Sequence, residues 1–373
     1  MVGLLEIPSK LEGATSRRIM HEYETKVRPE HFSQPIDIDV TLSGNQTSLM
    51  ANMPQYPFRS TANAIAFIEE LLTLGISSVV LRIRGSLYGP DDDAVIRSHG
   101  EAIRLIREHF PKDKLEIVVD PFSIALNKDG TWGVKDQDGN LSYEQTAELI
   151  QAITIHFAES GMDSIITLGR IEHEVLLTRQ ALEKIQRTDI KISSFSQNSE
   201  TKNAYIYLEH TPDKLDTGQK ILVGNFTEMN IQMLTDVLDG SNQVIVKPLE
   251  NFQLILMAQL LLANANFLSD YLHSPPVQAL LRLNESTAQK INRILHHIPQ
   301  FHELSRKVKV GAYSVSGTYY MQKKIEQEKS ERFAYNVVEE SLANALASAG
   351  PSLYRIIDRN ASWFVKQQRS LQA

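Results

Sequence analysis

Hydrophobic and polar positions along the chain follow two periods, each typical of one kind of element. Residues 36–40, Ile-Asp-Ile-Asp-Val, alternate at every step, which predicts a strand with one buried face. Residues 62–74 place Ile65, Ile68 and Leu71 on one side of a helix. Short apolar runs and amphipathic helices then recur in turn along the chain. Further strands are expected at residues 78–83, 115–120, 164–168, 190–195, 243–248, 308–314 and 353–357, with a strand or loop at 220–223.

Repeated strand–helix units predict a parallel sheet, and a count near eight favours a closed barrel over an open sheet. The expected fold is therefore an α/β protein, a (β/α)8 TIM barrel. Functional groups of such barrels gather where the strands end. Polar residues at the expected strand ends are Asp120, Ser194, Lys247 and Ser314 to Ser316.

Two segments do not fit the alternation of strands and helices. Residues 1–34 are polar with mixed charge, so we expect an N-terminal arm, followed by the barrel at 35–373. Residues 252–304 are too long for one barrel helix and predict a helical insertion. Its first helix is expected at 252–272, before the Pro275-Pro276 pair. The insertion is either an extra layer packed on the barrel, or a lid or oligomer contact.

Composition narrows the function classes. The 373 residues are 42% hydrophobic and carry a net charge of −7, with no basic patch for nucleic acid or an anionic membrane. The longest apolar stretch contains Gln253, Gln259, Asn264 and Asn266, which argues against a membrane span. The absence of cysteine excludes disulfides and thiolate metal sites. We see no signal peptide at the N-terminus and expect a cytoplasmic location.

Three motifs carry a resemblance to a known family. Residues 246–248 read Val-Lys-Pro at a strand end, residues 312–321 read AYSVSGTYYM, and residues 52–59 read NMPQYPFR. Their types and order resemble the MVKP, AYQVSGEYAM and SMPGVYR segments of the porphobilinogen synthase (5-aminolevulinate dehydratase) family. That family condenses two 5-aminolevulinate molecules into a pyrrole. The resemblance covers roughly residues 35–370 and implies that Lys247 is a Schiff-base lysine.

The departures from that family concern its metal and its second substrate. The family's second lysine falls on Asn198, whose amide cannot form an imine. Lys202 lies one loop turn away, but its spacing does not identify it as a substitute. Two arginines that hold the second substrate's carboxylate fall near Leu208 and on Gln219. The positions of the zinc-binding cysteines fall on Phe122, Ile124 and Trp132, which cannot bind a metal.

The resemblance leaves one substrate site in place. It implies catalytic roles for Lys247 and Asp120, and substrate contacts from Ser316, Tyr313 and Ser194. Alternative roles are a solvated rim lysine for Lys247, a helix cap for Ser316 and a structural carboxylate at the barrel mouth for Asp120. A tyrosine near the family's C-terminus aligns with Arg355, or with Tyr354 after a one-residue slip.

A possible metal cluster, Glu172-His173-Glu174, lies on an expected loop. Neighbouring side chains of an extended segment diverge, and His296, His297 and His302 of the insertion are expected to be exposed. We therefore expect no metal and no cofactor.

Two hypotheses of function follow. In the first, the chain is a diverged enzyme that forms one Schiff base through Lys247 with a small keto or amino-keto acid. Its reaction would be of the lyase, dehydratase or aldol type, without standard porphobilinogen synthesis. In the second, it is an inactive paralogue that binds a ligand or a protein. By resemblance, the N-terminal arm implies a homo-oligomer.

Overall fold

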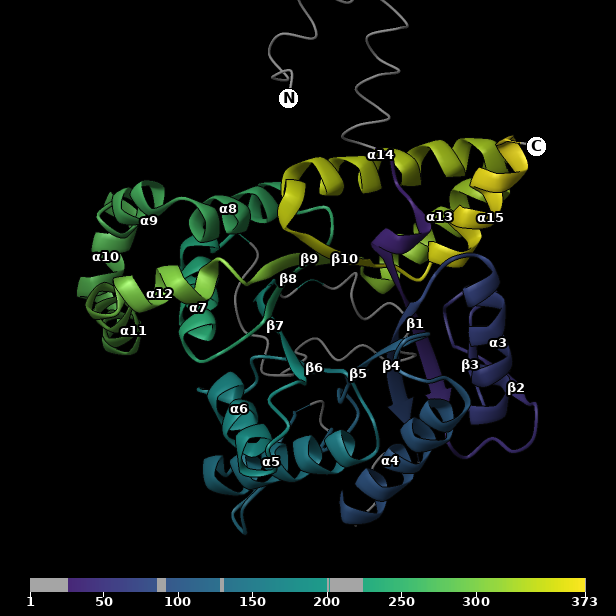
Figure 1. The fold of residues 1–373 in the computed structure, drawn as a ribbon, viewed down its shortest axis with the longest axis horizontal. Helices are drawn as coiled ribbons and strands as arrows, with labels where there is room; N and C mark the ends of the chain where they lie inside the picture. Colours follow the sequence, from purple (N-terminus) through teal and green to yellow (C-terminus); the bar gives the residue numbers. More distant parts are fainter. Residues whose placement is uncertain (1–25, 86–91, 128–130, 200, 202–223, 373) are drawn as a thin grey trace, which may run out of the picture.

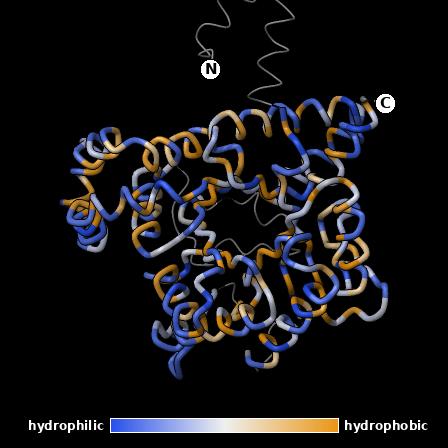
Figure 2. The backbone as a smooth tube through the Cα atoms, in the orientation of Figure 1, coloured by the Kyte–Doolittle hydropathy of each residue, from blue (hydrophilic) through white to orange (hydrophobic). Residues whose placement is uncertain are grey.

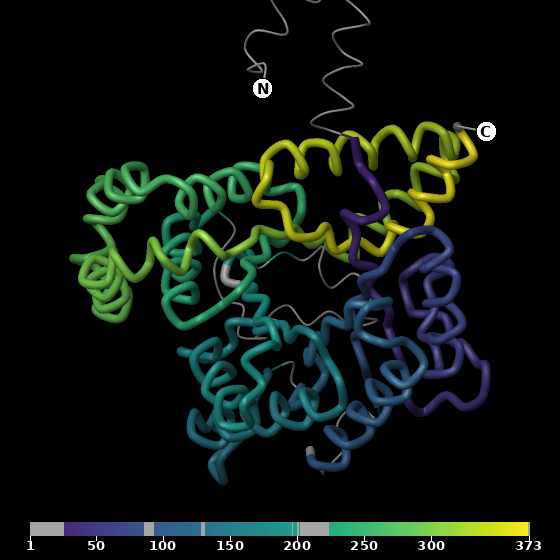
Figure 3. Tube along the Cα trace, viewed as in Figure 1, coloured from purple at the N-terminus to yellow at the C-terminus, as the bar shows by residue number. Residues whose placement is uncertain are grey.

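The computed structural model describes residues 26–85, 92–127, 131–199, 201 and 224–372. Eight parallel strands form a closed barrel, because the last strand pairs with the first as well as with its predecessor. Figure 3 shows this closure, with the purple start of the described chain beside its yellow end. The expected (β/α)8 barrel is confirmed. In pairing order, the barrel strands are β1 (Phe32–Asp39), β4 (Ser78–Arg84), β5 (Glu116–Asp120), β6 (Ser164–Thr167), β7 (Lys191–Asn198), β8 (Gln243–Lys247), β9 (Lys309–Tyr313) and β10 (Leu353–Ile357).

Helices surround the strands on the outside of the barrel (Figure 1). Local side chains fix where some of them begin. The Ser60 hydroxyl accepts a hydrogen bond from the backbone N–H of Asn63 at 3.1 Å, and Ser142 caps the next-but-one helix in the same way. The helices outside the insertion are α3 (Thr61–Thr73), α4 (Asp92–His109), α5 (Tyr143–Glu159), α6 (Glu174–Lys184), α7 (Phe226–Leu238), α8 (Phe252–Ala263), α13 (Ser316–Glu328), α14 (Glu331–Ala349) and α15 (Ala361–Gln372), with short 3-10 turns at Pro29–His31 and Gly350–Ser352.

The barrel strands bury both of their faces. Val244 and Val246 belong to the large apolar layer that also includes helix residues, whereas Ile245 belongs to a separate small cluster. Figure 2 shows hydrophobic residues recurring along both strands and helices. Since the small cluster joins residues from seven barrel strands, only the barrel interior can hold it. Its members are Val80, Val118, Ile166, Leu168, Phe195, Ile245, Tyr313 and Ile357.

A short hairpin, β2 (Thr47–Leu49) with β3 (Pro57–Arg59), was not expected from the sequence. It joins the barrel where Arg59 pairs with Ile38 of β1. A small apolar cluster lies beneath it, and the Tyr319 hydroxyl donates to the carbonyl of Pro54 at 3.0 Å. Strands of three residues are too short to show a period, which explains why the pattern did not predict them.

The segment expected to be an insertion divides into two parts. Helix α8 packs against α7, α14 and β9 and is therefore the barrel helix that follows β8. The insertion proper consists of four helices at the left of Figure 1. Two ion pairs connect it to residues that flank barrel helices: Lys290 pairs with Glu172, before α6, at 2.8 Å, and Arg293 pairs with Asp239, at the end of α7, at 2.6 Å. The four helices are α9 (Ala265–Leu272), α10 (Pro275–Leu283), α11 (Glu285–His296) and α12 (Ile298–Ser305).

Two boundaries differ from those expected. The single helix expected at 252–272 is two helices, because the chain bends by 111° at Asn264, whose side chain caps α9. Strand β1 already begins at Phe32, so the expected arm boundary at residue 34 falls inside a barrel strand. Residues 220–223 lie outside the described part of the chain.

The described helices include no single one that is both long and apolar enough to cross a bilayer. The bent pair α8 and α9 passes that test only when its two helices are counted together.

Candidate functional site

Lys247 ends β8 and lies two residues after Ile245. Alternate residues of a strand share a face, so the Lys247 side chain enters the barrel interior at the carboxyl end of the strands. Its Nζ atom lies 5.2 Å from the centre of the Tyr313 ring and 5.9 Å from that of Phe195. The side chain is partly buried. This is the end at which barrel enzymes carry their functional groups.

The surroundings of Lys247 favour the neutral amine. The pKa of Lys247 is lowered to about 7, chiefly by burial and then by the neighbouring charge of Arg82, against the opposing effect of Asp120. Arg359 and Arg170 add smaller effects in the same direction as Arg82. A large fraction of this lysine is therefore neutral near pH 7, which is the form that attacks a carbonyl group.

Arg82 is the residue at the barrel mouth that the sequence analysis missed. It lies on β4, two residues after the interior residue Val80, and is 7% exposed. Its guanidinium donates to Asp37 at 2.8 Å and to Asp120 at 3.3 Å, and it stacks 4.0 Å over the Phe122 ring. The hydrophobic pattern did not single out Arg82, because it predicted only a strand over residues 78–83 and Arg82 lies inside this mainly apolar run.

Arg359 is a second missed cation. It lies two residues after the end of β10, is 5% exposed, and donates to the other oxygen of Asp37 at 3.3 Å. Burial raises the pKa of Asp37, but Arg82 and Arg359 outweigh that effect and hold this pKa below its usual value. The rule that polar groups at strand ends are functional would have identified Arg359 if it had been applied to the last strand.

Three of the predicted site residues, Lys247, Asp120 and Tyr313, lie together at this end of the barrel. Asp120 ends β5, accepts the Arg82 hydrogen bond and also accepts from the backbone N–H of Phe122 at 3.1 Å. Tyr313 ends β9, and burial raises the pKa of its hydroxyl to about 12. The structure thus brings Asp120 and Tyr313 to Lys247.

Ser316, the fourth member of the expected site, is buried as the first residue of α13. The N-cap of that helix is Val315, without a side-chain cap. The alternative that Ser316 caps the helix therefore has no hydrogen bond to support it among the described residues.

Ser194 faces the other way. Its neighbour Phe195 belongs to the interior cluster, so Ser194 points outward, and its hydroxyl donates to Asp236 of α7. The structure does not bring Ser194 to Lys247.

Asn198 lies beside Lys247. The two residues are paired in the ladder between β7 and β8, and the Asn198 side chain is 4% exposed. Its Nδ2 atom is buried without a hydrogen-bond partner among the described residues. An amide therefore occupies the position next to the Lys247 amine, where the alignment places the family's second lysine.

The residues that resembled a metal cluster contact three different partners. Glu172 pairs with Lys290, His173 lies 3.7 Å from Asp239, and Glu174 is buried, where it accepts the backbone N–H groups of residues 168 and 170. Within residues 26–372, apart from the undescribed gaps, no group of three acidic or histidine side chains could hold a metal ion.

The remaining residues that the resemblance singled out lie away from Lys247 or outside the described part of the chain. Lys202, Leu208 and Gln219 lie outside the described residues. Tyr354 and Arg355 lie near the amino end of β10, where Arg355 is 3.7 Å from Glu116 at the start of β5. They are thus at the end of the barrel opposite to Lys247.

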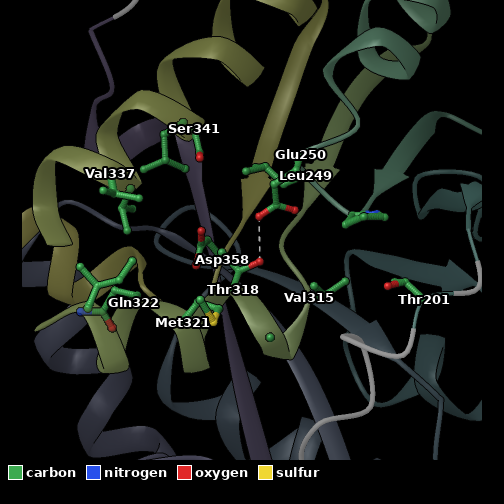
Figure 4. Close-up of a pocket in the computed structure, with 15 residues that line it drawn as sticks. Thr201, Leu249, Glu250, Val315, Thr318, Met321, Gln322, Val337, Ser341 and Asp358 are labelled. Carbon is green, nitrogen blue, oxygen red and sulfur yellow. Dashed lines mark hydrogen bonds between the residues drawn. The ribbon is translucent and has the colours of Figure 1, made fainter. Parts of the chain in front are cut away.

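A cavity of about 330 Å³ lies between the chain that follows Lys247 and helices α13 and α14. Figure 4 shows Glu250 and Thr318 joined across it by a hydrogen bond of 2.9 Å, with Asp358 beside Thr318. Its fifteen lining residues include two carboxylates, Glu250 and Asp358, and no basic side chain. An anionic ligand would be repelled here, so this cavity is not where a keto acid would place its carboxylate.

Asp358 should cost the protein stability at neutral pH. Burial raises the pKa of this carboxyl to about 6 from an ordinary 3.8, although it accepts the Asn360 N–H at 2.7 Å. Well below pH 3.8 it is protonated in both folded and unfolded chains, and the penalty grows as the pH rises from there and is complete above about 6. Asp358→Asn should therefore raise the free energy of unfolding by about 1–2 kcal/mol at pH 7.5 and by little at pH 4. Urea unfolding at both pH values measures this.

The control for that substitution is Asp113→Asn, because Asp113 is exposed. It should change stability at neither pH. An equal gain from both variants, or an Asp358→Asn gain that persists at pH 4, would contradict the assignment.

Comparison with known proteins agrees with this geometry. The family model of delta-aminolevulinic acid dehydratase matches residues 9–259, which include Lys247 and Asp120 but not Tyr313 or Ser316. The delta-aminolevulinic acid dehydratases of Bacillus subtilis and Archaeoglobus fulgidus are each 26% identical to the chain, over 60% of its length and 70% of theirs.

The fold is similar over a longer part of the chain. The crystal structure of delta-aminolevulinic acid dehydratase (porphobilinogen synthase) from Toxoplasma gondii, in complex with porphobilinogen, superimposes with a TM-score of 0.69 at 17% identity. It covers 95% of this chain and 89% of that one. With a family model that matches more than half of its length, the chain belongs to the delta-aminolevulinic acid dehydratase family.

Proposed function

We propose that this protein forms a single Schiff base through Lys247 with a small keto or amino-keto acid. The observation that carries the proposal is the position of Lys247: a partly buried amine at the carboxyl end of the barrel, with a pKa lowered to about 7. A lysine that served only as a solvated charge at the barrel rim would keep an ordinary pKa, because it would be neither buried nor placed near several cations. Membership of the family supports the same assignment.

The proposed chemistry begins with the neutral amine. Its nitrogen attacks the carbonyl carbon; the carbonyl oxygen then takes up a proton and the nitrogen loses one, which gives a neutral carbinolamine. A second proton on that oxygen allows it to leave as water, with formation of the iminium ion. Asp120 is paired with Arg82, and both charges act on the Lys247 amine. We therefore assign Asp120 the exchange of these protons.

The site favours one-substrate chemistry over porphobilinogen synthesis. Condensation of two 5-aminolevulinate molecules in the family uses a second lysine, and Asn198 occupies the position beside Lys247. The proposed reaction is instead a dehydration or an aldol-type step at the single iminium carbon. We propose no metal for it, since the aligned positions Phe122, Ile124 and Trp132 carry no ligand atoms suited to one.

The alternative is an inactive paralogue that binds a ligand or protein. One observation favours it: the charges at the mouth already pair with one another, since Arg82 bridges Asp37 and Asp120. A closed ion-pair network can hold a barrel together without any reaction.

Reductive trapping distinguishes the two. Incubation with levulinate or 5-aminolevulinate and cyanoborohydride should add the reduced ligand to one peptide, the one that contains Lys247. Peptide mass spectrometry locates the adduct. Absence of an adduct with a panel of keto acids would favour the inactive paralogue, and an adduct on Lys202 would mean that a second amine operates.

A further inference from the structure

Two guanidinium groups share one carboxylate inside the barrel mouth. Arg82 donates to one oxygen of Asp37 at 2.8 Å, and Arg359 donates to the other at 3.3 Å. The three side chains come from β4, β1 and the residue two places after the end of β10. Chain closure between β10 and β1 therefore builds this pair of cations next to the β8 lysine.

Arg359 retains donor capacity that its partner does not use. A guanidinium carries five N–H donors in a fixed planar fork, which matches the two oxygens of a carboxylate. Its contact with Asp37 uses one nitrogen at 3.3 Å, and the Nε atom of Arg359 is buried without a partner among the described residues. A group so deeply buried is costly to leave unpaired, which points to a ligand that completes it.

The electrostatic surroundings of Lys247 also favour an anion. The largest effects of charge on this amine come from three guanidinium groups, those of Arg82, Arg359 and Arg170, and from one carboxylate, that of Asp120, while the single carboxylate of Asp37 is shared by Arg82 and Arg359. Formation of an iminium ion would add a further positive charge. A substrate that brings one carboxylate balances that charge, whereas a neutral ketone does not.

We propose that Arg359 is the specificity-determining residue that binds the carboxylate of the substrate, with Arg82 holding the shared Asp37 in place. The inference rests on the proposed Schiff base at Lys247 and adds the residue of this chain that recognises the carboxylate of the keto acid. It provides a guanidinium from inside the barrel in a chain whose sequence lacks those expected near Leu208 and at Gln219.

The test compares two ketones of the same length. Levulinate has a carboxylate where 2-pentanone ends in a methyl group, and both present a methyl ketone to Lys247. We expect the wild-type protein to trap levulinate roughly tenfold faster or more at equal concentration, since a charge-assisted hydrogen-bond pair is worth at least that factor. Arg359→Gln should reduce the ratio to near one, and Arg359→Lys should leave an intermediate ratio.

The ratio of the levulinate rate to the 2-pentanone rate is insensitive to any change that affects both reactions equally. Loss of Arg359 also changes the pKa of Lys247, but that change slows both ketones equally. Arg355→Gln is the matched control, because Arg355 lies on β10 at the opposite end of the barrel, and it should keep the wild-type ratio.

The outcomes separate the two proposals. No adduct with either ketone refutes the Schiff base itself. Equal trapping of both by the wild type refutes the carboxylate site alone, and so does an unchanged ratio in Arg359→Gln. If that variant does not fold, as judged by circular dichroism, the wild-type ratio and Arg359→Lys still decide.

Discussion

Lys247→Met should abolish the trapped levulinate adduct while the barrel remains folded. Methionine keeps most of the apolar stem of lysine but has no nucleophilic nitrogen. Lys247→Arg should abolish the adduct too, because a guanidinium stays protonated at neutral pH. Intact-mass spectrometry after reduction measures the loss, and residual labelling at the wild-type rate in either variant would show that another amine reacts.

The pH dependence of trapping gives this prediction its sharpest form. With a pKa of about 7, roughly half of Lys247 is neutral at pH 7, whereas an ordinary lysine is neutral there to roughly one part in several thousand. The trapping rate should therefore rise with pH up to about 7 and level off above it. A rate that keeps rising tenfold per unit beyond pH 8 would indicate an unperturbed amine.

The same group should affect stability with a defined sign. Above about pH 10.5 the amine is neutral in folded and unfolded chains, and the lowered native pKa has no effect. As the pH falls towards 7, the unfolded chain binds a proton that the native protein resists. Lys247→Met should thus be at least as stable as the wild type at pH 7, with an advantage that shrinks towards pH 10.

Incubation of the protein with 5-aminolevulinate should yield no porphobilinogen above background, with or without added zinc or magnesium. Two molecules must be held for that condensation, and the position beside Lys247 carries an amide. An imine to the second substrate cannot form at Asn198. A colorimetric pyrrole assay, with an active porphobilinogen synthase as positive control, measures the product.

The trapping experiment serves as the internal control for this negative result. A preparation that forms the Lys247 adduct is folded and reactive, so the absence of pyrrole then reports on the second substrate alone. Steady turnover to porphobilinogen would overturn the one-substrate proposal.

The sequence was sufficient to predict the barrel because its strands are buried on both faces and separated by helices of regular period. All seven barrel strands after β1 begin within one residue of their expected starts, as β4 at Ser78 and β8 at Gln243 illustrate. The β2–β3 hairpin and the bend at Asn264 were missed, because three-residue strands and a capped break leave no periodic signal.

The candidate site could be predicted only where a motif or a strand end marked it. Lys247, Asp120 and Tyr313 each end a strand and lie together. Arg82 lies inside an otherwise apolar run, and what makes it tolerable there is its pairing with Asp37, 45 positions earlier in the chain. Such a long-range partner cannot be read from local pattern. Ser194 was assigned by its place near a strand end, but the strand's alternation turns it outward.

The pairing of β10 with β1 has a consequence for how this chain can diverge. Closure depends on backbone hydrogen bonds between strands, which hardly depend on side-chain identity. Residues after 259 supply β9, β10 and Arg359, and they lie beyond the family match, while the similar fold extends over 95% of the chain. This last third of the chain can therefore vary its functional side chains, provided that it still completes the ring. In this barrel, the closing strand can change the surroundings of Lys247, while Lys247 itself lies within the family match.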